Sequence, residues 1–240
     1  MLKTRLLAFS SSRVGSGGYL ESASSPIKKF LGDAVKNIAF IPFASVNADY
    51  EVYTNNVRAG LSSLPYNIQT AGNADAYSLI ENSDAIMVGG GNTFKLLHDL
   101  YDLGLVSLIQ DKVNSGTPYI GWSAGSNITG TTICTTNDMP IINPGSFNAL
   151  GFLPFQINPH YYNQPLSGFN GETRDQRLAE FLQLNPSTPI VALPEGTALL
   201  IDDGRLKLLG SSNAWLLSWQ LNNVVKKELT TAEDISFLLH

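Results

Sequence analysis

Short apolar runs alternate along this chain with segments in which apolar residues recur at helical spacing. The runs have the length of β-strands and are bounded by residues that favour turns. They lie at residues 6–9, 38–43, 68–70, 85–88, 119–122 and 190–193. Runs that are apolar throughout are typical of parallel strands buried on both faces, so the pattern predicts an α/β fold with a mainly parallel sheet.

The segments between the runs have the periodicity of amphipathic helices. Phe94, Leu97 and Tyr101, for example, lie on one face of such a helix. Strands that alternate with helices predict a doubly wound sheet sandwiched by helices. Pro26 is expected to interrupt the first helix, between residues 19 and 30, because proline has no backbone N–H to donate.

Near the C-terminus the pattern changes to that of a hairpin. Two apolar segments, residues 199–201 and 206–209, are joined by Asp202-Asp203-Gly204. An Asp-Gly pair favours a tight turn, so we expect an antiparallel hairpin at the edge of the sheet. No linker, internal repeat or shift in composition divides the chain, which predicts one domain over residues 1–240.

Composition narrows the class of protein. The 240 residues are 43% hydrophobic and 15% charged, with a formal net charge of −5, as expected of a globular fold with a sizeable core. Lysines and arginines are scattered, so neither nucleic acid nor an anionic membrane is expected as a partner. No stretch has the length and apolarity of a signal peptide or a membrane span, which favours a cytoplasmic location.

The chain offers little for a disulfide or a metal site. Cys134 is the single cysteine, and the histidines are His98, His160 and His240. None has partners at metal-ligand spacing, because Asp99 beside His98 would point to another side of a helix. We therefore expect no metal and no cofactor.

The first candidate for chemistry is Gly121-Trp122-Ser123-Ala124-Gly125, directly after an apolar run. Small neighbours let a sharp strand-to-helix turn close while the central side chain stands clear of the sheet, which is the geometry of a nucleophile elbow. Ser123 would also lie at a helix N-terminus, where N–H groups stabilise developing negative charge. The same residues are compatible with an ordinary turn that starts a helix.

A serine nucleophile requires a base and an acid. His160 is the natural base because Pro159 restrains its loop, although a loop histidine bonded to backbone is the alternative. Asp138, in a polar turn, and Glu195, after an apolar run, compete to orient the imidazole. Functional groups gather beyond the carboxyl ends of strands in open α/β sheets, which favours Glu195, but either acid is also compatible with a simple turn residue.

Acyl transfer also needs donors for an oxyanion. Residues 89–93, with the sequence Gly-Gly-Gly-Asn-Thr, follow a strand-like run and open a helix. The N–H groups of Gly90, Gly91 and Ala124 are candidates for an oxyanion hole. A phosphate cradle is the weaker alternative, because neither Gly-Lys-Ser/Thr nor a dinucleotide-binding glycine pattern is present.

Taken together, six segments resemble peptidase E, the α-aspartyl dipeptidase family of serine peptidases, in the same order along the chain. These segments are residues 88–94, 119–125, 135–140, 157–160, 171–174 and 193–196. The likeness extends from about residue 38 to residue 210. It implies a fold like that of the class I glutamine amidotransferases, with Ser123 where those enzymes place a cysteine.

The resemblance also implies an activity, the hydrolysis of dipeptides with an N-terminal aspartate. It implies that Ser123 is the nucleophile and His160 the base, with Glu195 or Asp138 as the third member. By the same resemblance Arg174 binds the aspartyl carboxylate. Asn92 is expected beside it in substrate binding.

Two other functions remain open on the same scaffold. Cyanophycinase-like hydrolases of β-aspartyl–arginine bonds share the fold, although the Gly-Glu-Thr-Arg segment at 171–174 argues against that activity. A catalytically silent ligand-binding protein is the third interpretation, which the retention of the serine, histidine and acids disfavours. Small peptides are the expected partners, and a homodimer is the assembly considered.

Overall fold

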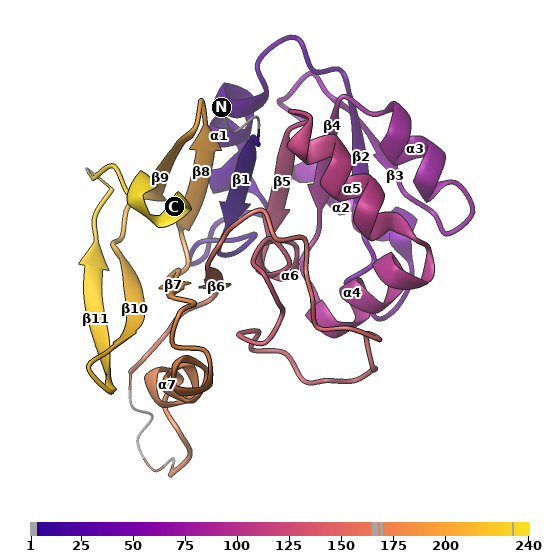
Figure 1. The fold of residues 1–240 in the computed structure, drawn as a ribbon. Coiled ribbons are helices and arrows are strands. Elements are labelled where there is room, and N and C mark those ends of the chain that lie inside the picture. The colour runs from indigo at the N-terminus through magenta and orange to yellow at the C-terminus, as the bar shows by residue number, and fades with distance from the viewer. Residues whose placement is uncertain (1–3, 165–167, 169, 232) are drawn as a thin grey trace.

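The computed structural model describes residues 4–164, 168, 170–231 and 233–240, and its strands form two sheets (Figure 1). The strands and helices of these residues are, in chain order, β1 Leu6–Phe9, α1 Glu21–Leu31, β2 Asn37–Ile41, α2 Tyr50–Gly60, β3 Asn67–Thr70, α3 Ala76–Asn82, β4 Ala85–Val88, α4 Thr93–Asp102, α5 Leu105–Asn114, β5 Tyr119–Trp122, α6 Ala124–Asn127, β6 Gln156–Asn158, α7 Arg174–Leu184, β7 Ile190–Ala192, β8 Thr197–Asp202, β9 Arg205–Gly210, β10 Ala214–Gln220, β11 Asn223–Leu229 and a terminal 3-10 turn, Ser236–Leu239.

The larger sheet has the strand order β3-β2-β4-β5-β1-β8-β9 within the described residues. The strands from β3 to β1 pair in parallel, which confirms the predicted α/β architecture with a mainly parallel sheet. β8 and β9 are the antiparallel hairpin expected near the C-terminus, with Asp203 and Gly204 in the turn, and β8 pairs with β1. The β5–α6 turn therefore lies near the middle of this sheet.

Alternate side chains of the parallel strands pack into two hydrophobic cores, one on each face of the sheet. Leu6 and Ala8 of β1 join the core formed with α3, α4 and α5. Leu7 and Phe9 join the core formed with α1 and α2. This two-residue alternation explains why the strands are apolar throughout, since each of their faces is covered by helices.

The second sheet, with the order β11-β10-β7-β6 in the described residues, is a correction to the prediction. The apolar run 190–193 was expected in the main sheet, but β7 pairs in parallel with β6 and antiparallel with β10. An apolar run has strand propensity whichever sheet it joins. Here β10 and β11, which the sequence did not predict, supply the partners, and α7 packs on them through Leu178 and Leu182.

Helix α1 is also different from the prediction, because it continues through Pro26. Proline removes one hydrogen bond of the helix interior. The helix nevertheless buries Ala23, Ile27 and Phe30 in the core on the α1–α2 face. Tertiary packing of an apolar face supplies most of the stability of a helix in a protein, and here it outweighs the missing bond.

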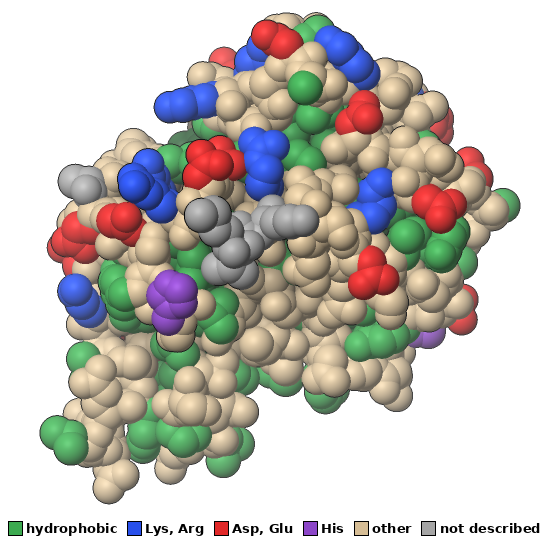
Figure 2. Space-filling view, turned by 45° about the horizontal axis from the view of Figure 1, so that its top comes forward, with side chains coloured by type: hydrophobic (Ala, Val, Ile, Leu, Met, Phe, Trp, Pro, Cys, Tyr) green, Lys and Arg blue, Asp and Glu red, His purple; other side chains and the backbone are tan. Residues whose placement is uncertain are grey.

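The face of the molecule drawn in Figure 2 carries no large patch of one kind of charge. Acidic and basic side chains are interspersed on the face drawn in Figure 2. None of the described helices has the length and apolarity needed to cross a bilayer.

Candidate active site

Ser123 lies at the sharp turn between β5 and α6, with φ 53° and ψ −115°. Such a conformation costs a non-glycine residue about 1–3 kcal/mol. The turn is tight because a Cβ on Gly121 would lie 2.4 Å from the Gly125 oxygen, and a Cβ on Gly125 would lie 2.2 Å from the Val88 oxygen. Both flanking glycines are thus required by close backbone approach, and the Ser123 side chain projects from the strained residue between them.

The structure brings Ser123, His160 and Glu195 together. His160 Nε2 lies 3.0 Å from Ser123 Oγ, and His160 Nδ1 lies 2.7 Å from Glu195 Oε1. With the Nδ1 proton donated to the carboxylate, Nε2 is free to accept the serine proton. The serine comes from the main sheet, whereas the histidine and the glutamate follow β6 and β7 of the second sheet.

The backbone of His160 is anchored across the two sheets. The residue has φ 52°, and its N–H donates to Ser10 Oγ over 2.9 Å. Ser10, directly after β1, in turn donates to the Leu193 oxygen over 2.8 Å. The buried Ser10 hydroxyl therefore fixes the histidine loop relative to the strand beside the Ser123 turn.

Asp138 has other partners. Its Oδ2 accepts hydrogen bonds from the N–H and the hydroxyl of Thr93, at 2.7 and 2.5 Å, and from Thr136 Oγ1 at 3.1 Å. The carboxylate thereby holds the N-terminus of α4, where negative charge is favourable. The side chain of the neighbouring Asn137 donates to the Pro159 oxygen over 2.8 Å. The turn that contains Asp138 therefore supports the backbone of the loop that carries His160.

The glycine loop lies against the serine. A Cβ on Gly90 would lie 2.9 Å from Ser123 Cβ. Within the described residues, the N–H groups of Gly90, Gly91 and Ala124 donate to no protein acceptor. These groups are the candidate donors for an oxyanion next to Ser123.

Asn92 caps helix α4. Its Oδ1 accepts from the Lys95 N–H over 3.0 Å, and its Nδ2 donates to the Met139 oxygen over 2.9 Å. Both polar ends of the amide are thus engaged within the protein. Asn92 is also not among the residues that line the cavity beside Ser123.

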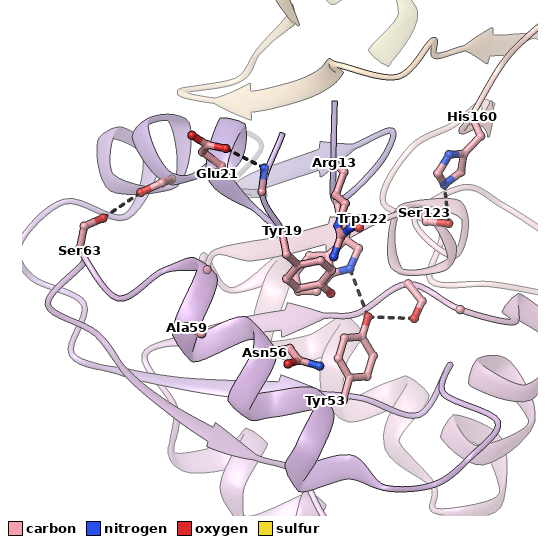
Figure 3. A pocket seen from close by; sticks show the side chains of 16 residues that line it. Arg13, Tyr19, Glu21, Tyr53, Asn56, Ala59, Ser63, Trp122, Ser123 and His160 are labelled. Atoms are coloured by element: carbon pink, nitrogen blue, oxygen red, sulfur yellow. Dashed lines mark hydrogen bonds between the residues drawn. The ribbon is translucent and has the colours of Figure 1, made fainter. Parts of the chain in front are cut away.

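A cavity of about 880 Å³ opens beside Ser123 and His160 (Figure 3). Tyr19, Tyr53 and Trp122 line it, and Tyr53 donates to the Gly90 oxygen over 2.9 Å while accepting from Trp122 Nε1 at 3.2 Å. Burial raises the pKa of Tyr53 and that of Tyr19, so both phenols stay neutral. Sequence reasoning missed this wall, because no motif marks residues from α2 and from the loop before α1 as neighbours of the serine.

Arg174 is the first residue of α7, whose start is fixed by a capping box between Thr173 and Gln176. Burial, and then the charge of Arg177, lower the pKa of the Arg174 guanidinium. The next residue, Asp175, accepts a hydrogen bond from Tyr161, which follows His160. The start of α7 thus lies beside Tyr161, the residue that follows His160 in the chain. Arg174 itself does not line the cavity described above.

No three histidine, cysteine or acidic side chains in the described ranges are close enough together to hold a metal ion. Cys134 is a free, exposed thiol.

Comparison with known proteins identifies the family. The model of peptidase family S51 matches residues 6–209. Peptidase E of Nostoc sp. strain PCC 7120 is 46% identical over 240 residues, covering 100% of this chain and 98% of the relative. Peptidase E of Shewanella amazonensis is 47% identical over 239 residues, covering 99% of this chain and 100% of the relative.

Solved structures agree at the level of the fold. The crystal structure of a candidate peptidase E protein from Listeria monocytogenes EGD-e superposes with a TM-score of 0.68 at 25% identity, covering 87% of this chain and 99% of that one. A peptidase from an acI-B1 Actinobacterium superposes with a TM-score of 0.72 at 20% identity, covering 98% and 97%. Since the family model spans nearly the whole chain and full-length relatives are close to half identical, the chain belongs to peptidase family S51 and is a serine peptidase.

Proposed function

We propose that this peptidase hydrolyses dipeptides with an N-terminal aspartate through an acyl-enzyme on Ser123. The observation that most directly supports the acyl-enzyme chemistry is the His160 imidazole, which bridges the Ser123 hydroxyl and the Glu195 carboxylate. A serine hydrogen-bonded to a base that an acid orients is an arrangement that activates the hydroxyl for nucleophilic acyl transfer. We further propose that the fold is of the class I glutamine amidotransferase type, with Ser123 in place of the cysteine.

The reaction would proceed in two steps. Ser123 Oγ attacks the peptide carbonyl as His160 Nε2 takes its proton, and the oxyanion is stabilised by N–H groups of Gly90, Gly91 and Ala124. The imidazolium, stabilised by Glu195, then gives the proton to the departing amine. A water molecule, activated by the same imidazole, attacks the acyl-enzyme and releases aspartate.

Arg174 is proposed to bind the side-chain carboxylate of the aspartate. A guanidinium at a helix N-terminus lies at the positive end of the helix dipole, and Arg177 adds like charge. An anionic substrate group would offset the repulsion of the guanidinium by the helix dipole and by Arg177. It would also pair with the guanidinium through two parallel hydrogen bonds. The neutral side chain of asparagine offers no such charge, which predicts strong preference for Asp-X over Asn-X.

The proposed chemistry is tested by Ser123→Ala and His160→Ala. Each should lower kcat for Asp-Leu by at least about 10³-fold, since members of a triad act as a unit. Aspartate release is measured at saturating substrate, with Ser107→Ala on the surface of α5 as the matched control. Turnover near the control value in Ser123→Ala would exclude Ser123 as the nucleophile.

The proposed specificity is tested by Arg174→Met. The variant should lose about 2–4 kcal/mol of transition-state binding for Asp-Leu, seen as a fall in kcat/KM, while the Asp-Leu to Asn-Leu preference disappears. Arg177→Met is the control, because its guanidinium is exposed and faces Glu172 at 3.7 Å. Preference for aspartate retained in Arg174→Met, or lost only in Arg177→Met, would contradict the assignment.

A further inference from the structure

A second arginine, Arg13, reaches the cavity beside the Ser123–His160 pair. It lies in the loop between β1 and α1 and lines the same cavity as the serine and the histidine (Figure 3). This loop begins at Ser10, whose hydroxyl accepts a hydrogen bond from the His160 N–H. Arg13 is therefore three residues from an anchor of the catalytic histidine.

The loop holds Arg13 in place on both sides. Ser11 Oγ donates to the Arg13 oxygen over 2.6 Å, and the Leu20 N–H donates to the Ser12 oxygen over 2.8 Å. The guanidinium carbon lies 5.7 Å from the centroid of the Tyr19 ring, a cation–π distance. The backbone of the loop is thus held, and the exposed guanidinium lies beside the Tyr19 ring at the cavity.

The charge of Arg13 has no partner in the described part of the protein. Among the described residues Arg5, Arg58 and Arg177 each face a carboxylate, at 2.8, 2.5 and 3.7 Å, whereas Arg13, Arg174 and Arg205 form no ion pair, and of these three only Arg13 lines the cavity. Arg13 has no carboxylate within 4.0 Å among the described residues, and its side chain donates no hydrogen bond there. An exposed guanidinium that lines the cavity beside Ser123 and His160 is suited to an anionic group of the substrate.

The substrate proposed above has two carboxylates, and they lie on opposite sides of the bond that is cut. Arg174 is assigned to the aspartyl side chain, on the acyl side. The C-terminal carboxylate belongs to the leaving residue. At the α1 end of the cavity the wall carries the carboxylate of Glu21, which repels an anion, so the favourable position for the second carboxylate is at Arg13.

On the basis of the proposed function, we infer that Arg13 binds the C-terminal carboxylate of the leaving residue. The cavity is then the leaving-group subsite, and Tyr19, Tyr53 and Trp122 form the wall against which the second side chain packs. If the residue directly after the scissile bond must end in a free carboxylate, the substrate is limited to two residues. Arg13 is thus a specificity-determining residue that selects dipeptides over longer peptides.

The test compares two substrates that differ only at the C-terminus, Asp-Leu and aspartyl-leucinamide. Aspartate release gives kcat/KM for each. The wild type should prefer the free carboxylate by about 10–100-fold, the range expected for hydrogen bonds to a charged group. In Arg13→Met this ratio should fall to about one, and Arg13→Lys, which keeps the charge without the planar fork, should give an intermediate ratio.

Controls separate this inference from its alternatives. Arg205→Met removes the same charge from an exposed position on β9 and should keep the wild-type ratio. A wild type that does not discriminate between the two substrates, or an Arg13→Met variant in which both rates fall equally, would overturn the inference. If the wild type releases aspartate from neither substrate, the proposed function fails instead. Thermal melts of the variants exclude unfolding as the cause.

Discussion

At the scale of single residues, the acid that can orient His160 is decided by hydrogen-bond partners. Both Asp138 and Glu195 are plausible from their sequence contexts. Glu195 contacts the imidazole at 2.7 Å, whereas the Oδ2 atom of Asp138 is shared by Thr93 and Thr136. The two carboxylates therefore have different hydrogen-bond partners, the ring of His160 for Glu195 and the start of α4 for Asp138.

This division predicts opposite outcomes for two isosteric substitutions. Glu195→Gln should lower kcat by on the order of 10³, because an amide neither fixes the tautomer nor stabilises the imidazolium. Asp138→Asn should mainly lower stability, by about 1–3 kcal/mol, because it weakens a charged acceptor at a helix N-terminus. Steady-state kinetics and urea unfolding of both variants give the measurement, and loss of turnover in Asp138→Asn alone would reverse the assignment.

At the scale of elements, side chains between strands fix where neighbouring strands begin. Asp84, directly before β4, accepts hydrogen bonds from the N–H groups of Asn37 and Lys36, at 2.8 and 3.0 Å. It thereby holds the start of β2 beside the start of β4, two strands that pair in parallel. The N–H of Asn37, and then that of Lys36, lower the pKa of the Asp84 carboxyl.

The lowered pKa makes this contact dependent on pH. Its stabilisation is fully present above the unfolded-state pKa, near 3.8, and is lost as the pH falls through the lower folded-state pKa. Asp84→Asn should therefore lower the free energy of unfolding at neutral pH by less than about 1 kcal/mol, because the group is exposed, and lower the Tm accordingly. The Tm difference from wild type should close as the solution is made acidic. Asp111→Asn, at an exposed position on α5, is the control, and a constant difference at all pH values would contradict the account.

At the scale of the whole molecule, the site exists only because two sheets meet. The serine lies 37 positions from the histidine, and the histidine 35 positions from the glutamate. The main sheet carries the elbow and the second sheet carries the other two side chains. Ser10 joins them, since its hydroxyl bonds to the backbone of His160 and to the Leu193 oxygen.

Removal of this junction should affect both stability and turnover. Ser10→Ala leaves the partly buried His160 N–H without its partner, whereas the Leu193 oxygen keeps the hydrogen bond from the Tyr161 N–H, so the substitution should cost about 1–3 kcal/mol in urea unfolding. Because the histidine loop loses its anchor, kcat should fall by about 10-fold or more while KM stays near the wild-type value. Ser83→Ala, which removes another buried hydroxyl at the end of α3, should change stability alone. A Ser10→Ala variant with normal kcat would show that the loop is held by its other contacts.

The sequence by itself determined the features that depend on local pattern. Apolar runs located the strands of the parallel sheet, an Asp-Gly pair located the β8–β9 hairpin, and two glycines around Ser123 located the strained turn. Each of these follows from backbone geometry over a few neighbouring residues. The tertiary structure decided the rest: the sheet that β7 joins, the continuation of α1 through Pro26, the acid beside His160, and the arrival of Arg13 at the cavity. These outcomes depend on packing and hydrogen bonds between residues far apart in the chain, which no local pattern specifies.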